Sequence, residues 1–157
     1  MILPAQRIRH LCITRGMVKP FTPRTVRFGS TYGLGPAGYD VRIQQSVELW
    51  PGRFMLASTI ESFDLPDSVL GRVHDKSTWA RRGLSLFNTI LDPGWRGEAL
   101  TLELKNVGDE FIKIPCGAPI AHIVFEDLSE ATEQPYRGKY QDQAAHPVAA
   151  IQEADHD

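Results

Sequence analysis

The sequence predicts an all-β fold, and two observations support this prediction. From Tyr39 onward, short runs of alternating apolar and polar residues follow one another; in the first run, Tyr39, Val41 and Ile43 are the apolar members. Turn formers separate these runs, as at Pro115-Cys116-Gly117. Many short strands joined by turns are typical of a sandwich or a barrel-like fold.

Eight strands are expected before the sequence becomes polar. They cover residues 39–43, 46–49, 54–62, 69–74, 84–91, 100–106, 110–114 and 119–125. Two short helices are also expected, at residues 5–12, where apolar residues recur at helical spacing, and at residues 76–82, which Gly83 ends. Between the first helix and the first strand, residues 20–38 are rich in proline and glycine and predict an irregular connection.

The glycines of this connection formally match a dinucleotide-binding pattern. Residues 33–38 read GLGPAG, which fits GxGxxG. A dinucleotide site needs a strand before this pattern and a helix after it. No clear strand precedes the pattern, and strand-like residues follow it, so we reject a dinucleotide site.

Length and composition indicate one globular domain. The 157 residues suit a single unit, with an N-terminal segment (1–37), a β core (38–128) and a polar C-terminal tail (129–157) whose last residues are expected to be disordered. The net charge of −2 argues against a broad nucleic-acid or membrane surface. Two distant cysteines argue against a disulfide framework and predict a cytoplasmic protein. No signal peptide is expected, and no apolar run approaches the roughly 20 residues of a membrane helix.

Lys76, Ser77 and Arg81 form the first group of candidate functional residues. If residues 76–82 form a helical turn, Ser77 and Arg81 share one face because they are four residues apart. Lys76 and Ser77 would then lie at a helix N-terminus, where free backbone N–H groups bind anions. A solvated helix end with Ser77 as its N-cap explains the same residues equally well.

Asp92 and Glu103 are the candidate acids. Asp92 opens an Asp-Pro-Gly sequence, so it is explained as a turn former, although this leaves its carboxylate free. Glu103 lies between Leu102 and Leu104 in an expected strand, so it points away from these leucines. On a solvent face Glu103 would be an ordinary surface carboxylate, which composition favours. In a pocket, burial would raise its pKa and suit it to acid–base catalysis.

The sequence lacks the zinc-deaminase pattern. The five histidines are scattered, and no His-x-Glu is followed by Pro-Cys-x-x-Cys. The segment PCGAP at residues 115–119 has no second cysteine. A zinc site of this kind is therefore not expected.

Several motifs, in this order, resemble the dCTP deaminase family of the dUTPase/dCTP deaminase superfamily. They are HDKSTWARRGL at residues 74–84, DPGWRG at 92–97 and TLEL at 101–104, with AGYDVR at 37–42 upstream and YRGKYQDQ at 136–143 downstream. The resemblance implies a distorted β-barrel or jelly-roll-like fold (dUTPase-like, a β-clip). It also implies a homotrimer with active sites between subunits, and zinc-independent deamination of dCTP, bound with Mg²⁺, to dUTP and ammonia. The dUTP would feed dUMP and dTTP synthesis, and dTTP is a candidate inhibitor.

The resemblance also implies roles for individual residues. Glu103 would move protons between water and the leaving ammonia, Ser77 would hold that water or the triphosphate, and Arg81 would stabilise charge near the cytosine ring. The implied substrate-binding residues are Lys76, Thr78, Asp92, Thr101, Leu102, Tyr136, Lys139 and Gln143.

Among these residues, Asp92 would hold the deoxyribose 3′-hydroxyl, and main-chain groups near Thr101 and Leu102 would read the base. The residues from 136 to 143 would close over the phosphates from a neighbouring subunit. Lys76 stands where the family commonly has arginine, so the positive charge is kept but the bidentate hydrogen bonding of a guanidinium group is lost.

The chain departs from the family between the Asp-Pro-Gly turn and Glu103. Glu98-Ala99 adds one residue there. A β-bulge could absorb the extra residue and keep Glu103 in a pocket. Without a bulge, the one-residue slip would turn Glu103 towards the core.

Two alternative functions stay open. The first is a dUTPase or a bifunctional enzyme that converts dCTP to dUMP, because Asp92 stands where that relative has its water-activating aspartate. Against a pure dUTPase, the tail lacks a glycine-rich closing motif with phenylalanine, and Glu103 would have no role. The second is a non-catalytic nucleotide-binding relative, whose marker would be the loss of Glu103, Ser77 or Arg81; all three are present.

Overall fold

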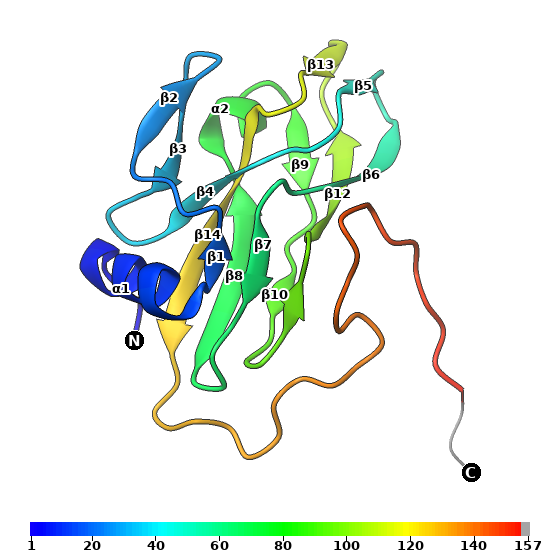
Figure 1. Ribbon diagram of the computed structural model, residues 1–157. Coiled ribbons are helices and arrows are strands. Elements are labelled where there is room, and N and C mark those ends of the chain that lie inside the picture. Colours follow the sequence, from blue (N-terminus) through cyan, green and yellow to red (C-terminus); the bar gives the residue numbers. More distant parts are fainter. Residues whose placement is uncertain (155–157) are drawn as a thin grey trace.

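The computed structural model describes residues 1–154, within which two helices and fourteen strands form (Figure 1). The last three residues, Asp155 to Asp157, belong to the tail end that was expected to be disordered and lie outside the described residues. The expected all-β class is confirmed. The strands fall into four antiparallel sheets, and within the described residues these do not close into a regular barrel.

The sheets bring together strands that are distant in the sequence. The largest has the order β10 (Ile90–Leu91), β8 (Val69–Asp75), β14 (Pro119–Asp127), β4 (Tyr39–Arg42), β3 (Ser30–Leu34) and β2 (Thr25–Arg27). A second sheet joins β6 (Phe54–Ser58), β12 (Thr101–Asn106) and β9 (Leu84–Leu86). A third joins β1 (Val18–Lys19), β7 (Ser62–Asp64) and β11 (Arg96–Gly97), and β13 (Ile112–Ile114) pairs with β5 (Val47–Leu49).

Alternating side chains of β14 and β12 supply the centre of the core. Ile123 and Phe125 of β14, and Leu102 and Leu104 of β12, are fully buried. The residues between them are partly exposed, as expected for strands with one face on the core. Glu103 therefore lies on the face of β12 opposite to the core.

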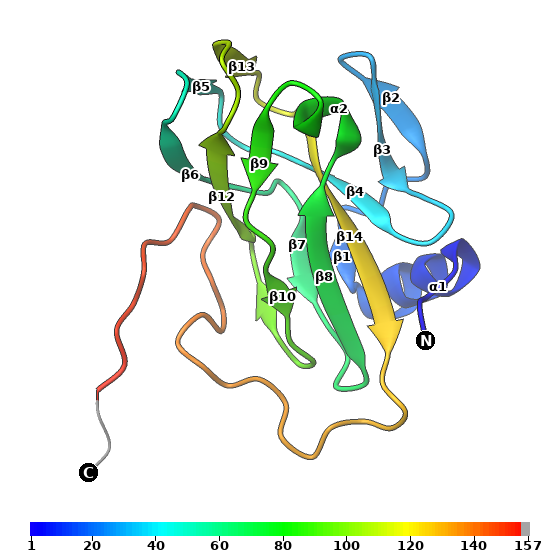
Figure 2. The same cartoon turned by 180° about the vertical axis from the view of Figure 1, so that it is seen from behind.

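Helix α1 (Ala5–Arg15) covers one side of the strands, and the tail covers the other. Ile8, Leu11 and Cys12 are buried at helical spacing, and Gly16 ends the helix in the left-handed conformation. The helix was expected at residues 5–12 and is one turn longer. Figures 1 and 2 show the tail, in orange and red, running past β10 and β12 on the side away from α1.

The expected irregular connection at residues 20–38 was wrong, because part of it is a hairpin. β2 and β3 pair with Thr25 opposite Tyr32, and both residues are good strand formers. Phe28 and Gly29, both at positive φ, make the turn between them. A strand therefore does precede the glycine pattern, but β4 follows it instead of a helix, so a dinucleotide site stays rejected.

Two expected strands are each split between two sheets. Residues 54–62 give β6 and the start of β7, which pair with β12 and with β1 and β11 respectively. Residues 84–91 give β9, which pairs with β12, and β10, which pairs with β8. An apolar run shows that a segment is extended and buried, but it does not show where the chain changes sheets.

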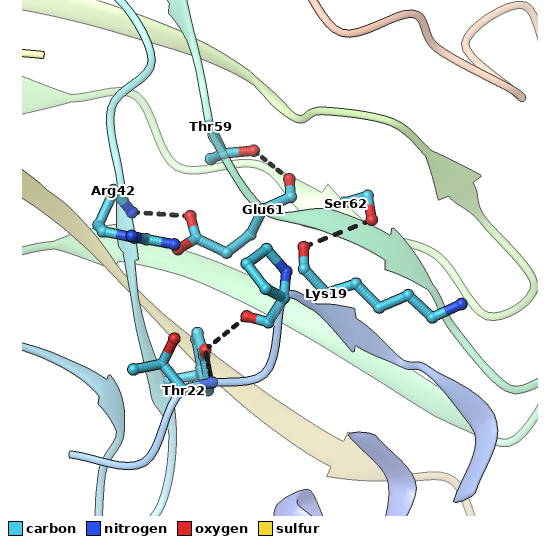
Figure 3. Close-up of polar contacts among 8 residues, drawn as sticks. Lys19, Thr22, Arg42, Thr59, Glu61 and Ser62 are labelled. Carbon is cyan, nitrogen blue, oxygen red and sulfur yellow. Dashed lines mark hydrogen bonds and ion pairs between the residues drawn. The ribbon is translucent and has the colours of Figure 1, made fainter. Parts of the chain in front are cut away.

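A buried ion pair fixes the point where β6 gives way to β7. The carboxylate of Glu61, which is fully buried, accepts hydrogen bonds from the backbone N–H of Arg42 at 2.9 Å and from its Nε at 2.7 Å (Figure 3). The hydroxyl of Thr59 donates to the carbonyl of Glu61 at 2.7 Å. The ion pair thus attaches the break between β6 and β7 to Arg42, the last residue of β4.

The second helix is shorter than expected. α2 (Ser77–Ala80) is a single turn, and its N-cap is Lys76. Ser77 is therefore the first helical residue, so the interpretation of Ser77 as the N-cap was wrong. Gly83 ends this segment at φ 85°, as the sequence predicted.

Within residues 1–154, no helix is both long enough and apolar enough to cross a membrane.

Candidate active site

A cavity of about 710 Å³ lies between the face of β12 that carries Glu103 and the C-terminal tail. Most of its lining is apolar, with Leu56, Ile90 and Leu100 contributed by the strands and the loop before β12. The polar groups at its wall include Asp92, Thr101, Glu103, Tyr136, Lys139 and Gln143. The structure thus brings together six of the residues implied by the resemblance.

Glu103 is one of the acids in the wall of this cavity. It lies opposite Leu56 on β6, and both residues line the cavity. Burial raises the pKa of the Glu103 carboxyl above its ordinary value. A carboxyl that holds its proton more tightly than usual is suited to take a proton and give it back.

The extra residue before Glu103 does not turn its side chain towards the core. After β11 the chain bends at residues 98–99, and Ala99 and Leu100 are buried one after the other. The regular alternation then resumes at Thr101. The backbone N–H of Leu100 donates to the hydroxyl of Thr59 at 2.9 Å, and the N–H of Thr59 donates to the carbonyl of Leu100 at the same distance, which holds the irregular segment against the neighbouring strand.

Asp92 is both a turn former and part of the cavity wall. Its carbonyl accepts the N–H of Trp95 at 3.0 Å, and Gly94 adopts φ 79°, which favours glycine. Asp92 itself lines the cavity. The carbonyl of Pro93 accepts the N–H of Tyr136 at 2.8 Å, so the same turn also holds the tail.

Thr101 is the point at which the tail meets β12. Its hydroxyl accepts hydrogen bonds from Nε2 of Gln143 at 2.8 Å and from the backbone N–H of Val148 at 3.0 Å. The backbone N–H of Glu98 donates to the carbonyl of Gln143 at 2.7 Å. The tail therefore closes over the cavity of its own chain, and the tail from a neighbouring subunit, which the resemblance implies, stays a prediction.

The four candidate residues around α2 lie elsewhere. Ser77, Thr78 and Arg81 are exposed, and within the described residues none of them, nor Lys76, lines the cavity. Trp79 anchors the turn by donating from Nε1 to the carbonyl of Pro119 at 2.6 Å. The ammonium group of Lys76 pairs with Asp40 at 2.7 Å.

Leu102 can contact a ligand only through its backbone, because its side chain is fully buried. The N–H of Phe87 donates to the carbonyl of Glu103, so the main chain of Glu103 faces β9. Alternate residues of a strand point their main-chain groups to the same edge. Thr101 therefore faces this edge as well, beyond the end of β9, whereas Leu102 faces β6.

Sequence reasoning missed several residues of the site and its surroundings. Trp95 and Val148 line the cavity, Asp40 pairs with the ammonium group of Lys76, and His122 contacts Asp40. Asp40 stands in one of the motifs that carry the resemblance, and this was the signal that could have drawn attention to it. His122 gave no signal, because only the strand register brings it beside Asp40.

In the part of the chain that the structure describes, no three His, Cys, Asp or Glu side chains come together as a set of metal ligands. Three carboxylate residues, Asp92, Glu103 and Glu153, line the cavity.

The fold of the chain is similar to that of solved dUTPases. It superposes on the EIAV dUTPase with a TM-score of 0.57 at 21% identity, over 78% of this chain and 98% of that chain. It superposes on the dUTPase of Staphylococcus bacteriophage 80alpha with a TM-score of 0.56 at 16% identity, over 76% and 92% of the two chains. The expected dUTPase-like fold is confirmed.

Sequence comparison identifies the family to which the chain belongs. Residues 40–128 match the family model described as dCTP deaminase-like. The dCTP deaminase of Nitrosococcus oceani is 31% identical over 173 aligned residues, which cover 87% of this chain and 92% of that protein. A relative from Methanoculleus marisnigri named "dCTP deaminase, dUMP-forming" is 39% identical over 107 residues, 64% of this chain and 56% of that protein. The chain belongs to the dCTP deaminase-like family and is an enzyme of that family.

Proposed function

We propose that this enzyme hydrolyses dCTP to dUTP and ammonia, with Glu103 as the general base and acid. The observation that carries the proposal is the position of Glu103: a carboxyl with a raised pKa in the wall of a largely apolar cavity. Two relatives named dCTP deaminase, 31% and 32% identical over 87% of the chain, support dCTP as the substrate.

The proposed reaction uses one proton shuttle. Glu103 takes a proton from water as the water oxygen bonds to C4 of cytosine, which gives a tetrahedral intermediate. Glu103 returns this proton to the ring nitrogen N3, which took up the electron pair of the C4–N3 double bond. Glu103 then carries the remaining hydroxyl proton to the amino nitrogen, the C4–N bond to that nitrogen breaks, and ammonia leaves a uracil carbonyl behind. No zinc is required, because the positioned carboxylate activates the water. The apolar wall keeps bulk water away from the intermediate.

The other cavity residues are proposed to hold the nucleotide. The main chain of Thr101 faces the open edge beside Glu103 and is the better placed of the two expected base readers, since Leu102 faces β6. Asp92 would hold the 3′-hydroxyl of the sugar. Tyr136, Lys139 and Gln143 come from the tail and would cover the phosphates.

Mg²⁺ is proposed to enter with the triphosphate. Mg²⁺ commonly binds through phosphate oxygens, water and one or two carboxylates rather than in a cage of protein ligands. The cavity, which has Asp92 in its lining, fits this arrangement. The metal would neutralise phosphate charge, while protein groups would contact the cytosine ring.

A homotrimer is proposed because the cavity lacks the residues of α2. Ser77 and Arg81, with Thr78 beside them, are exposed and could complete the site of a neighbouring copy. Next to the cavity the surface is apolar: Phe54 and Phe87 are 51% and 49% exposed, with their rings 6.0 Å apart. Such a patch is suited to contact between subunits. We further propose a cytoplasmic location, and dTTP as an inhibitor that competes for the same cavity.

A bifunctional enzyme is the second candidate, and two observations favour it. Asp92 lines the cavity, where its carboxylate could activate water against a phosphate, and one relative is named dUMP-forming.

Purified protein incubated with dCTP or with dUTP tests both candidates when ammonia and pyrophosphate are measured separately. The first candidate predicts ammonia from dCTP and no pyrophosphate from either nucleotide. Pyrophosphate from both nucleotides, with ammonia from dCTP, would establish the bifunctional enzyme instead. Pyrophosphate from dUTP without ammonia from dCTP would contradict both and indicate a dUTPase.

A further inference from the structure

Outside the cavity, three titratable side chains from three different elements meet at one point. The carboxylate of Asp40, on β4, pairs through Oδ2 with Nζ of Lys76 at 2.7 Å and through Oδ1 with Nδ1 of His122 at 2.8 Å. The side chains of Lys76 and Asp40 are only 9% and 15% exposed. Asp40 therefore joins the N-cap of α2 to β14, which carries His122.

Asp40 is held in its charged form by these two partners. Burial opposes its ionisation, but the hydrogen bonds from His122 and Lys76 outweigh burial and hold the pKa of the Asp40 carboxyl below its ordinary value. A charged carboxylate neutralises the ammonium group of Lys76. The Lys76 cation is thus occupied within its own chain.

The strands fix the positions of Asp40 and its two partners, Lys76 and His122. Asp40 on β4 pairs in register with His122 on β14, and His122 pairs with His74 on β8. Lys76 follows directly after β8. The sheet therefore sets the distance between Lys76 and Asp40.

The glycine pattern of residues 33–38 makes room for the imidazole of His122. A Cβ atom at Gly38 would lie 2.3 Å from Nε2 of His122, and one at Gly35 would lie 3.8 Å from its Cε1. Because the Gly38 contact is far shorter than atoms allow, a side chain at this position would displace the ring. The pattern that resembles a nucleotide-binding loop therefore serves a histidine of the same chain.

Lys76 also organises the turn that follows it. Its carbonyl accepts the backbone N–H groups of Trp79 at 2.9 Å and Ala80 at 3.0 Å. The carbonyl of Ser77 accepts the N–H of Arg81 at 3.1 Å. A shift of Lys76 would therefore shift the turn that presents Ser77 and Arg81.

We propose that Asp40 and His122 are positioning residues that act through Lys76. They hold the first turn of α2 in place, so that Ser77 and Arg81 meet the nucleotide in a fixed orientation, and the ammonium group of Lys76 serves this contact rather than a phosphate. This role rests on the proposed function to the extent that Ser77 and Arg81 act on the nucleotide.

Four variants of the full chain test the proposal: Asp40→Asn, His122→Ala, His122→Asn and the control Glu126→Gln. The amide of asparagine can donate to Asp40 in place of Nδ1 of histidine, so His122→Asn keeps the contact that His122→Ala removes. Glu126→Gln weakens an exposed ion pair with Arg72 between the neighbouring strands β8 and β14. Hydrogen exchange of residues 76–83 and the kcat and KM for dCTP are measured for each variant.

We expect faster exchange at residues 76–83 in Asp40→Asn and His122→Ala. We also expect kcat to fall about tenfold with little change in KM, since small displacements of catalytic groups cost up to about a hundredfold. His122→Asn should restore both readouts, and Glu126→Gln should change neither. If Asp40→Asn does not fold, the comparison of His122→Ala with His122→Asn decides alone.

Unchanged exchange at residues 76–83 in His122→Ala would overturn the proposal, as would equal losses in His122→Asn and His122→Ala. A rise in KM with unchanged kcat would overturn it as well, because that result assigns Lys76 to phosphate binding. If the wild-type chain releases no ammonia from dCTP, the proposed function fails. The exchange measurements then still decide whether Asp40 and His122 hold α2.

Discussion

Nε2 of Gln143 donates a 2.8 Å hydrogen bond to the hydroxyl of Thr101, two residues before Glu103 on the same strand. The tail is therefore anchored to the strand that carries the proposed base. The Thr101 hydroxyl also accepts the N–H of Val148. The side chain of Thr101 therefore links the closed tail to the strand that positions Glu103.

Thr101→Val should loosen the tail without disturbing β12. Valine has nearly the same shape as threonine but offers no acceptor to Gln143 or Val148. The loss of two hydrogen bonds should cost the docked tail about 1 kcal/mol, or roughly a fivefold increase in hydrogen exchange at residues 143–148. Thr14→Val on α1 is the control, because its hydroxyl only bonds the carbonyl of His10 on the exposed side of the helix. Equal hydrogen exchange at residues 143–148 in the two variants would show that the Thr101 hydroxyl does not anchor the tail.

Glu61→Gln should destabilise the whole fold. The substitution leaves the guanidinium of Arg42 partly buried without its counter-charge, and breaking a buried pair in this way costs about 3–5 kcal/mol. Glu48→Gln is the matched control, because Glu48 pairs with Lys113 at the surface, where a pair contributes about 1 kcal/mol or less. Urea unfolding of both variants measures the difference, and similar losses would show that the Arg42–Glu61 pair does not hold the break between β6 and β7.

Much of the fold was predictable from local sequence, and the particular misses have a physical cause. Alternation at Tyr39, Val41 and Ile43 predicts β4 because that pattern depends only on a strand with one buried face. The splits within residues 54–62 and 84–91 depend on which strand lies alongside, and this information is non-local. The β2–β3 hairpin was hidden because the prolines around it dominate any local interpretation.

The residues of the site divide in the same way, into those that local sequence predicts and those that it does not. Asp92, Thr101 and Glu103 stand close together in the sequence and line one cavity, as the motifs implied. Asp40 and His122 are 82 residues apart and meet only through the pairing of β4 with β14. No spacing rule along the chain could have joined them.

The stabilisation provided by Asp40 should depend on pH. The pKa of Asp40 is lowered by folding, so its contribution is present above the unfolded value near 3.9 and is lost as the pH falls through the folded value. Asp40→Asn should therefore be less stable than wild type by about 2 kcal/mol at pH 7, and the difference should shrink below pH 4. Urea unfolding at pH 7, 5, 4 and 3 provides the comparison, and a gap that stays constant over this range would contradict the account.

Glu103 should show the opposite dependence. Its pKa is raised by folding, so its stabilisation is present below the unfolded value and is lost as the pH rises through the folded value. At pH 7 burial disfavours the charged form of this carboxyl in the folded protein, so Glu103→Gln should stabilise the fold by about 1 kcal/mol or less. This gain should vanish below pH 4 in unfolding experiments. A variant that is less stable than wild type at pH 7 would show that the charge of Glu103 is favoured in the fold.

The measurement that tests the central claim most directly is ammonia release from dCTP by the wild-type chain and by Glu103→Gln, with dCTP binding measured on the same samples. The account predicts that wild type releases ammonia, and that the variant binds dCTP but turns over roughly a hundred- to ten-thousandfold more slowly, as expected when a general base is removed. Turnover that is unchanged in Glu103→Gln would contradict the account.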